Sequence, residues 1–366
     1  MKKTCLSVLL LLLAGLLLLS ACCSSPASAA ESGKQLRFGI TPKFTGVDYF
    51  IACENGAKKA AEDLGIFLDW QGDPSGQESV AKQQATIQTF IDKQYDAIIL
   101  SSLDESSFAD TLRQARAQGI KVITFDADVV PDARDAFVNG TTEVEMVKAM
   151  FKGLLQDKPE GGMLAIISTD PNASNQNARI REIQKQFEEG KDSIYSKYNF
   201  ASNIVYAGNN QAEADTKVNA LMTQERDLCG VFALSSMAGP AAGKAMKDLG
   251  MSPGDISIQT ISVPVSSIDD MKSGLIKSVV LWQPYDLGYV AVEYAKDLIE
   301  GKANIGDTTY VSSLCGKNKI GDENYESAHN VLENNTVILS AAILYNLDNV
   351  DQFRGYPDAT SGFKTQ

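Results

Sequence analysis

Apolar residues recur along most of the chain in two alternating patterns, short strand-like runs and longer amphipathic stretches. The first pair predicts a strand over 35–41, where every second residue is apolar, and a helix over 48–65. Gly65 ends the first predicted helix and Gly119 follows a later one, at positions where a left-handed C-cap conformation costs glycine little. The pattern goes on to predict strands at 66–70, 97–101 and 122–125 and helices at 77–93 and 106–118.

After 138–141 the same alternation begins again. The expected elements are a helix at 143–157, a strand at 163–168, a helix at 175–189, a strand at 204–207, a helix at 212–224, a strand at 231–234, a helix at 239–250 and strands at 256–261 and 276–282. A helix at 284–300 follows, and a last strand is expected at 336–339. Continuously apolar strands such as 97–100 are typical of parallel sheets covered by helices on both faces.

These two sets predict an α/β fold of two doubly wound, Rossmann-like lobes, with a ligand cleft at the carboxyl ends of their strands. We expect the first lobe to comprise 35–140 and 283–312, and the second lobe 141–282 and 313–353. Residues 354–366 would form a tail.

The amino terminus has the layout of a signal peptide. Lys2 and Lys3 precede the uncharged apolar run 8–19, which is too short for a spanning helix of about 20 residues. Leu19-Ser20-Ala21-Cys22 resembles the bacterial lipobox, which implies a signal peptide over 1–21, a lipid on Cys22 and a flexible tether over 22–34. The competing cleavage site is Ala27-Ser28-Ala29, which would release a soluble protein.

The composition of the chain argues against several classes of function. Among the 366 residues, 46 acidic residues outnumber 33 basic ones, and the net charge of -13 argues against a nucleic-acid partner. His329 is the single histidine, so a catalytic triad or a histidine-rich zinc site has little to be built from. The three cysteines of the body, Cys53, Cys229 and Cys315, form no CxxC pair. We therefore expect a binding protein with no metal and no cofactor.

Polar and aromatic residues follow the predicted strands of both lobes. Hydroxyl-rich ligands need fixed donors and acceptors, and aromatic rings cover the C–H faces of a sugar. The candidate ligand-binding residues are Lys43, Phe50, Ser101, Asp126, Asn175, Gln176, Ser235, Ser236, Trp282 and Gln283.

Each candidate also has a purely structural interpretation. Lys43 can be a solvated loop cation, Asp126 a turn residue and Asn175 a helix N-cap, while Phe50 and Trp282 can belong to the core. Their joint position at strand ends of two lobes favours a binding site, because caps and core residues need not converge there.

Several stretches resemble one family. They are Thr41-Pro42-Lys43, Glu54-Asn55-Gly56-Ala57, Tyr95-Asp96-Ala97-Ile98-Ile99, Phe125-Asp126-Ala127-Asp128, Ser174-Asn175-Gln176-Asn177, Leu281-Trp282-Gln283-Pro284, Asp286-Leu287-Gly288-Tyr289 and Asn349-Val350-Asp351-Gln352-Phe353. Over essentially 35–353 the chain resembles the type I periplasmic sugar-binding proteins of ABC importers, in the branch that holds rhamnose-binding and autoinducer-2-binding proteins.

The resemblance implies roles for individual residues. Lys43, Asp126 and Gln176 would hydrogen-bond ligand hydroxyls, while Phe50 and Trp282 would stack on the ligand. Asn175, Leu234 and Ser236 depart from the autoinducer-2 receptors, which have Asp, Pro and Ala there, and favour the rhamnose branch. The resemblance also implies a monomer that delivers its sugar to an ABC permease, outside the cytoplasm, held on the membrane through Cys22.

Three alternatives remain open. The first is an autoinducer-2 receptor for uptake or signalling, and the second is a co-receptor that presents a ligand to a membrane sensor. The third is an extracytoplasmic sugar enzyme in which Asp126 would act with Asp128 or Asp48 as acid and base. We expect no enzymatic turnover.

Overall fold

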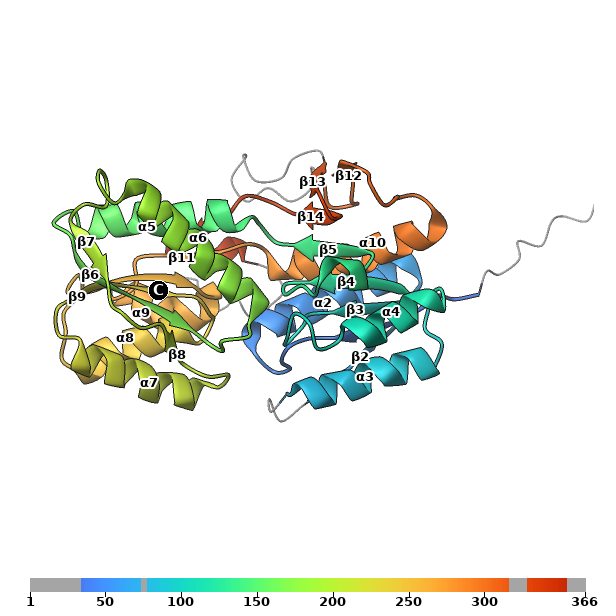
Figure 1. Cartoon of the computed structure of the whole chain (residues 1–366), viewed down its shortest axis with the longest axis horizontal. Coiled ribbons are helices and arrows are strands. Elements are labelled where there is room, and N and C mark those ends of the chain that lie inside the picture. Colours follow the sequence, from blue (N-terminus) through green and yellow to red (C-terminus); the bar gives the residue numbers. More distant parts are fainter. Residues whose placement is uncertain (1–33, 74–77, 316–327, 354–366) are drawn as a thin grey trace, which may run out of the picture. The chain divides into compact units, whose positions relative to one another are not determined.

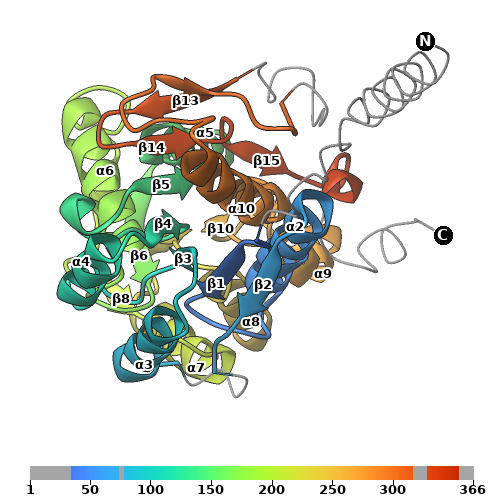
Figure 2. The ribbon, with the colours of Figure 1, turned by 90° about the vertical axis from the view of Figure 1, so that its right-hand side faces the viewer.

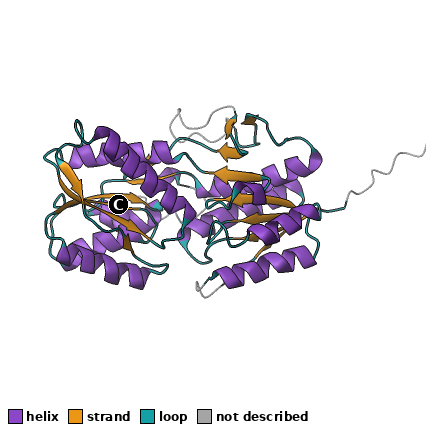
Figure 3. Ribbon diagram, in the orientation of Figure 1, coloured by secondary structure: helices purple, strands orange, loops and turns teal. Residues whose placement is uncertain are grey.

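The computed structural model describes residues 34–73, 78–315 and 328–353, which form two separate β-sheets flanked by helices. The predicted signal peptide, Cys22 and the tail lie outside these residues. Within them, no helix has both the length and the apolar character needed to span a membrane. Figure 3 shows strands and helices alternating along the chain, as the sequence predicts.

The first sheet is mostly parallel and is built around five strands from the amino-terminal part of the chain. Its helices are α2 (Asp48–Leu64), α3 (Val80–Asp92), α4 (Ala109–Ala117) and α10 (Pro284–Glu300) (Figure 1). The order across the sheet is β12 (Thr309–Tyr310), β13 (His329–Leu332), β14 (Thr336–Ile338), β5 (Ala136–Asn139), β4 (Lys121–Phe125), β3 (Ala97–Leu100), β1 (Arg37–Thr41) and β2 (Phe67–Trp70) (Figure 2).

Strand β3 shows why its sequence is apolar throughout. Ile98 and Leu100 pack with residues of α3 and α4, whereas Ala97 and Ile99 pack in the core formed with α2 and α10. Successive side chains of a strand point to opposite faces, so a sheet covered on both faces needs apolar residues at every position.

The second sheet is built in the same way from the middle of the chain. Its helices are α5 (Glu143–Asp157), α6 (Ser174–Gly190), α7 (Gln211–Gln224), α8 (Ala238–Asp248) and the short α9 (Ile268–Lys272). The order is β15 (Ile343–Tyr345), β11 (Val279–Leu281), β10 (Ser257–Ile261), β9 (Leu228–Ala233), β6 (Gly162–Ser168) and β7 (Tyr198–Phe200), and β8 (Val205–Tyr206) also pairs with β6.

Most helix boundaries follow local chemistry that can be read from the sequence. Gly65 and Gly119 have φ of 68° and 87°, so both adopt the left-handed conformation expected after α2 and α4. Helix α4 begins three residues later than predicted. The Asp104 carboxylate accepts hydrogen bonds from the backbone N–H groups of Ser106 and Ser107 and holds them in a turn before the helix.

The expected division of the carboxyl-terminal part between the lobes is wrong. The sequence pattern places 313–353 in the second lobe, but β13 and β14 belong to the first sheet. Strand β14 pairs in parallel with β5, where Thr336 lies opposite Phe137. Only β15 joins the second sheet, by antiparallel pairing with β11. Because β5 is short and preceded by irregular chain, the alternation of apolar residues did not reveal it as a partner strand.

The chain passes between the two sheets three times, at 140–142, at 282–283 and at 339–342. These crossings contact one another. The backbone N–H of Ser340 donates to the carbonyl of Gly140 at 3.1 Å, and a Cβ atom at Gly140 would lie 2.1 Å from the Trp282 ring. Glycine at 140 is therefore required by close packing of the Trp282 side chain.

Helices α2 and α10 pack unusually closely through two glycines. A Cβ atom at Gly56 would lie 1.8 Å from the carbonyl oxygen of Tyr285, and one at Gly288 would lie 1.9 Å from that of Cys53. Backbone oxygens cannot move aside without shifting a whole helix. We therefore expect Gly56→Ala to lower the free energy of unfolding by about 2 kcal/mol or more, although alanine has the higher helix propensity.

Denaturant unfolding of Gly56→Ala beside Lys58→Ala checks this prediction. Lys58 is exposed on the same helix and, among the described residues, pairs only with Glu54, so its loss should cost no more than about 0.5 kcal/mol. Equal stability of the Gly56→Ala variant and the wild type would contradict the close helix packing.

Candidate functional site

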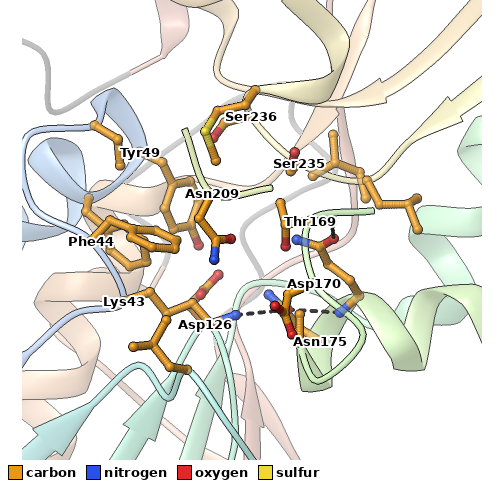
Figure 4. Close-up of a pocket in the computed structure, with 18 of the residues that line it drawn as sticks. Lys43, Phe44, Tyr49, Asp126, Thr169, Asp170, Asn175, Asn209, Ser235 and Ser236 are labelled. Carbon is orange, nitrogen blue, oxygen red and sulfur yellow. Dashed lines mark hydrogen bonds between the residues drawn. The ribbon is translucent and has the colours of Figure 1, made fainter. Parts of the chain in front are cut away.

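The loops at the carboxyl ends of strands from both sheets enclose a central pocket of about 240 Å³. Figure 4 shows Lys43, Tyr49 and Asp126 on one side, facing Asn175, Thr169 and Ser235 on the other. The lining residues are Lys43, Phe44, Val47, Tyr49, Phe50, Glu78, Ser79, Val80, Leu103, Asp104, Asp126, Thr169, Asp170, Asn172, Ala173, Asn175, Gln176, Arg179, Asn209, Leu234, Ser235, Ser236, Met237, Ile261, Ser262, Leu281 and Trp282.

Asp126 occupies a strained turn directly after β4. Its φ is 61°, and the N–H of Ala127 donates to the carbonyl of Phe125 at 2.6 Å, which closes a three-residue γ-turn around Asp126. The Ser101 hydroxyl donates to Oδ2 of the Asp126 carboxylate at 2.9 Å. The turn and this hydrogen bond together aim a carboxylate into the pocket, although the side chain is only 6% exposed.

Lys43 brings a buried ammonium group to the same side of the pocket as Asp126. Its side chain is 6% exposed, and Nζ donates to Oδ1 of Asn175 at 3.2 Å, which links a first-sheet loop to a second-sheet helix. Burial lowers the pKa of Lys43, and the charge of Asp126 partly opposes that change. No carboxylate of the described residues lies within salt-bridge distance of Nζ, so the ammonium group can bind ligand oxygens.

Lys43→Met should therefore have opposite effects on stability and binding. Removing a buried, unpaired charge should stabilise the ligand-free protein by about 1 kcal/mol or more, while ligand affinity should fall about tenfold. Thermal unfolding without ligand and calorimetry with ligand measure the two quantities. A variant that is less stable than the wild type would show that Lys43 serves the fold rather than the ligand.

Helix α6 supplies donors from the second sheet. Gln176 accepts hydrogen bonds through Oε1 from the Ser168 hydroxyl at 2.6 Å and the Thr169 N–H at 2.7 Å. Its Nε2 makes no hydrogen bond to another described residue, so this amide group remains a donor for a ligand. Arg179 lies three residues further, on the same helix face, and is 3% exposed.

The Arg179 guanidinium has a hydrogen-bond partner at Nε but none at Nη2 among the described residues. Its Nε donates to Oε2 of Glu143 at 3.1 Å, and its guanidinium lies 5.5 Å from the centre of the Trp282 ring. Nη2 is buried and has no partner among the described residues. An unpaired buried donor costs free energy, and a ligand oxygen in the pocket would remove that cost.

Aromatic rings form one wall. The Trp282 Nε1 group donates to the Tyr49 hydroxyl at 3.1 Å, and the two rings meet edge to face. Phe50 packs edge to face against Tyr49 at 5.0 Å between ring centres. Burial and the nearby Asp126 charge raise the pKa of Tyr49 well above its ordinary value, so its hydroxyl stays protonated.

The structure brings most of the sequence-predicted residues into this pocket. Those on its wall are Lys43, Phe50, Asp126, Asn175, Gln176, Ser235, Ser236 and Trp282. Ser101 and Gln283 do not line it. Ser101 lies behind Asp126 as its hydrogen-bond donor, and Gln283 is turned to the carbonyl of Gln352, to which its Nε2 donates at 2.8 Å.

Tyr49 and Arg179 also line the pocket without being among the sequence-predicted residues, as do the loop residues Thr169, Asp170 and Asn209. The i to i+3 spacing of Gln176 and Arg179 could have identified the arginine, because it places both on one face of α6. Nothing in the sequence pattern distinguishes the three loop residues.

The histidine, the cysteines and possible metal ligands of the described residues were also candidates for chemistry at the site. Within the described ranges, no group of three or more histidine, cysteine, aspartate or glutamate side chains could hold a metal ion. His329 is buried away from the pocket, where its ring nitrogens pair with the Ser312 hydroxyl at 2.8 Å and the Leu339 carbonyl at 3.1 Å. Cys53, Cys229 and Cys315 are free thiols.

The architecture of two α/β sheets around a pocket agrees with the match to a protein family model described as a periplasmic binding protein domain, which covers residues 38–303. The chain belongs to this family. Membership implies an extracytoplasmic location.

The chain is also similar to individual binding proteins, in sequence and in structure. The chain is 25% identical over 284 residues to the ribose import binding protein RbsB of Bacillus subtilis, covering 75% of this chain and 86% of that protein. An ABC transporter solute-binding protein of Clostridium phytofermentas with bound L-rhamnose has a TM-score of 0.78 and 21% identity, over 87% of this chain and 98% of that one. LsrB of Clostridium saccharobutylicum in complex with AI-2 has a TM-score of 0.75 and 21% identity, over 87% and 100% of the two chains. These neighbours confirm the predicted fold class, and the first relative is named as a binding protein for import.

Proposed function

We propose that the chain captures one monosaccharide in the central pocket and delivers it to an ABC permease. The observation that carries the proposal is the convergence of buried, incompletely paired hydrogen-bonding groups, from Lys43, Asp126 and Arg179, beside an aromatic wall. Sugars present hydroxyl groups around apolar C–H faces, so they need this combination. The names of the ribose relative and of the rhamnose-bound neighbour support it.

The volume and lining of the pocket favour a small deoxy sugar. Pockets for drug-sized ligands measure roughly 300 to 1,000 Å³, so the pocket of about 240 Å³ suits one sugar ring. Leu234, Ile261 and Leu281, at the carboxyl ends of β9, β10 and β11, line part of it with apolar side chains. A 6-deoxyhexose such as rhamnose would place its methyl group against such a wall, where a sugar hydroxyl would lose hydrogen bonds.

Binding would be coupled to closure of the two lobes. Ligand groups would bridge Lys43 and Asp126 on the first lobe to Gln176 and Arg179 on the second, and so would stabilise the arrangement in which both contact the sugar. The closed protein would present a surface to the permease. In this proposal the protein is a monomer that the lipid on Cys22 holds at the outer side of the cell membrane.

The second candidate is autoinducer-2. The structural similarity to LsrB, which is in complex with AI-2, supports this candidate. It is nearly as high as the similarity to the rhamnose-bound neighbour, which supports a sugar. Autoinducer-2 is also a small, hydroxyl-rich molecule, and it would use the same donors and acceptors. Asn175, Leu234 and Ser236 favour the rhamnose branch.

A thermal-shift screen of neutral monosaccharides, polyols and autoinducer-2 tests the proposal. A ligand present at 100 times its Kd adds about 2.7 kcal/mol to the free energy of unfolding, which gives a clear rise in Tm. We expect the largest rise with L-rhamnose and no turnover of rhamnosides by the same protein. The absence of a shift with every sugar would contradict the carbohydrate proposal, and a shift with autoinducer-2 alone would favour the second candidate.

A further inference from the structure

Two contacts hold the Arg179 guanidinium on the α6 side of the central pocket. One is the hydrogen bond from its Nε to Oε2 of Glu143 at 3.1 Å, and the other is the Trp282 ring, whose centre lies 5.5 Å from the guanidinium. Glu143 does not line the pocket, and its only ion-pair partner among the described residues is Arg179. Any influence of this carboxylate on a ligand would therefore pass mainly through the arginine.

The backbone position of Glu143 is fixed by its place in the fold. Glu143 is the first residue of α5, directly after the first crossing between the sheets. The Thr142 hydroxyl caps this helix by accepting the Glu145 N–H at 3.2 Å. Trp282 belongs to another crossing, so both groups that hold Arg179 come from segments next to the connections between the lobes.

The pocket also contains a charge that would attract Arg179. Burial lowers the pKa of Lys43 most, while the Asp126 charge raises this pKa and the Arg179 charge lowers it, so both charged groups lie near the same ammonium group. Opposite charges attract strongly in a pocket that excludes water. A guanidinium that could move freely would pair with Asp126, and a sugar would then have to break that pair before it could use either group. Among the described residues, no ion pair joins Arg179 to Asp126.

We propose that Glu143 is a positioning residue, which holds the guanidinium away from Asp126 and leaves Nη2 of Arg179 available to donate to the sugar. This inference rests on the proposed function. Nη2 is buried and has no partner in the described part of the chain, while Nε of the same group is engaged by Glu143. Burial raises the pKa of Glu143, and the charge and hydrogen bond of Arg179 oppose that change, as expected of two groups that act as a pair. The donor is thus in place before the ligand arrives, which lowers the ordering cost of binding.

Calorimetry with L-rhamnose, D-ribose and D-xylose tests the inference. We expect Glu143→Gln to weaken sugar binding about tenfold, because the neutral amide holds the guanidinium less firmly and Asp126 captures it. Glu145→Gln is the matched control and should leave the affinity unchanged, since Glu145 lies in the same first turn of α5 but is exposed and pairs with Lys148. Arg179→Met should also weaken binding about tenfold. Adding Glu143→Gln to Arg179→Met should cause no further loss, because a residue that acts through another has no effect once that other is absent.

The fluorescence of Trp282 reports on the position of Arg179 without a ligand. In a Trp70→Phe background, Trp282 is the single tryptophan of the chain, and the guanidinium near its ring should alter its emission. We expect Glu143→Gln to shift this emission towards that of Arg179→Met. The control Glu145→Gln should leave the emission unchanged.

The outcomes separate the inference from the proposed function. If the substitutions at 143 and 179 act independently, so that the double variant binds about 100-fold more weakly than the wild type, Glu143 does not act through Arg179 and the inference is wrong. Wild-type affinity and emission of Glu143→Gln would also overturn it. If no sugar binds to the wild type, the proposed function fails, whereas the emission of Trp282 still shows whether Glu143 holds the arginine in place.

The double variant keeps the test decisive if Glu143→Gln alone does not fold, because losing one partner of a buried ion pair costs more than losing both. A folded double variant with the affinity of Arg179→Met supports the inference. A double variant that binds more weakly, or that also fails to fold, shows that Glu143 serves the fold by itself and contradicts the inference.

Discussion

Asp126→Asn should reduce sugar affinity by a factor of about 30 or more, the equivalent of about 2 kcal/mol. In the pocket, the carboxylate is the buried acceptor of the first lobe, and hydrogen bonds to a charged acceptor are stronger than those to a neutral one. Asparagine keeps the size of the side chain and tolerates a positive φ almost as well as aspartate does. The loss would therefore report on the charge rather than on the turn.

Isothermal titration calorimetry measures this loss, and thermal unfolding shows whether the variant is folded. Asp126→Ala is the less informative change, because alanine at a φ of 61° adds backbone strain that lowers stability on its own. Ser101→Ala is a milder comparison variant, because it removes only the hydroxyl that donates to Oδ2 of Asp126. It should reduce sugar affinity less than Asp126→Asn does. An Asp126→Asn variant with wild-type affinity would rule out this carboxylate as a ligand acceptor.

Trp282→Ala should abolish measurable sugar binding and lower the free energy of unfolding by about 3 to 5 kcal/mol. The indole is fully buried and contacts Tyr49, Arg179 and Gly140 at once. Its removal would leave a cavity, free the Arg179 guanidinium and take away the stacking surface. Stability and binding should therefore fall together, which is typical of a residue shared by the core and the site.

Trp282→Phe separates the two effects, because it keeps an aromatic ring but loses the hydrogen bond to Tyr49. We expect this variant to fold and to bind several-fold more weakly. Trp70 is the other tryptophan of the chain and lies outside the pocket wall, so Trp70→Phe should leave the affinity unchanged. If ligand quenches the fluorescence of Trp70→Phe but not of Trp282→Phe, Trp282 is the residue that responds to the sugar. Unchanged affinity of both Trp282 variants would contradict the stacking role.

The alternation of apolar residues was sufficient to predict most strands and helices of both sheets. Helix α5 begins and ends at the predicted residues, and its start is fixed by Thr142, whose side-chain oxygen accepts a hydrogen bond from the Glu145 N–H. The pattern could not assign β13 and β14 to a sheet. Pairing between β14 and β5 joins residues some 200 positions apart, and local periodicity carries no information about such a partner.

The site was predictable where side chains follow directly from strand ends. Asp126, Lys43 and Gln176 come from loops next to buried strands, so their position follows from the topology. Their orientation does not. Ser101 and Gln283 leave strand ends too, yet one supports Asp126 and the other binds a backbone carbonyl of the carboxyl-terminal segment. Arg179 was missed because it lies one turn inside a helix, where a cation is usually a solvated surface charge.

The γ-turn at Asp126 also limits how the specificity of this protein can evolve. A positive φ in a three-residue turn admits glycine, asparagine and aspartate far more readily than any other residue. Substitutions at 126 are therefore restricted to a very small set, of which aspartate alone is anionic. Ser235, Ser236 and Asn175 line the opposite wall with ordinary backbone conformations and accept many residue types. Descendants of this sequence that adapt to a new sugar should therefore change first at the residues on the second-sheet side of the pocket. They should keep the Asp126 carboxylate on the first-sheet side.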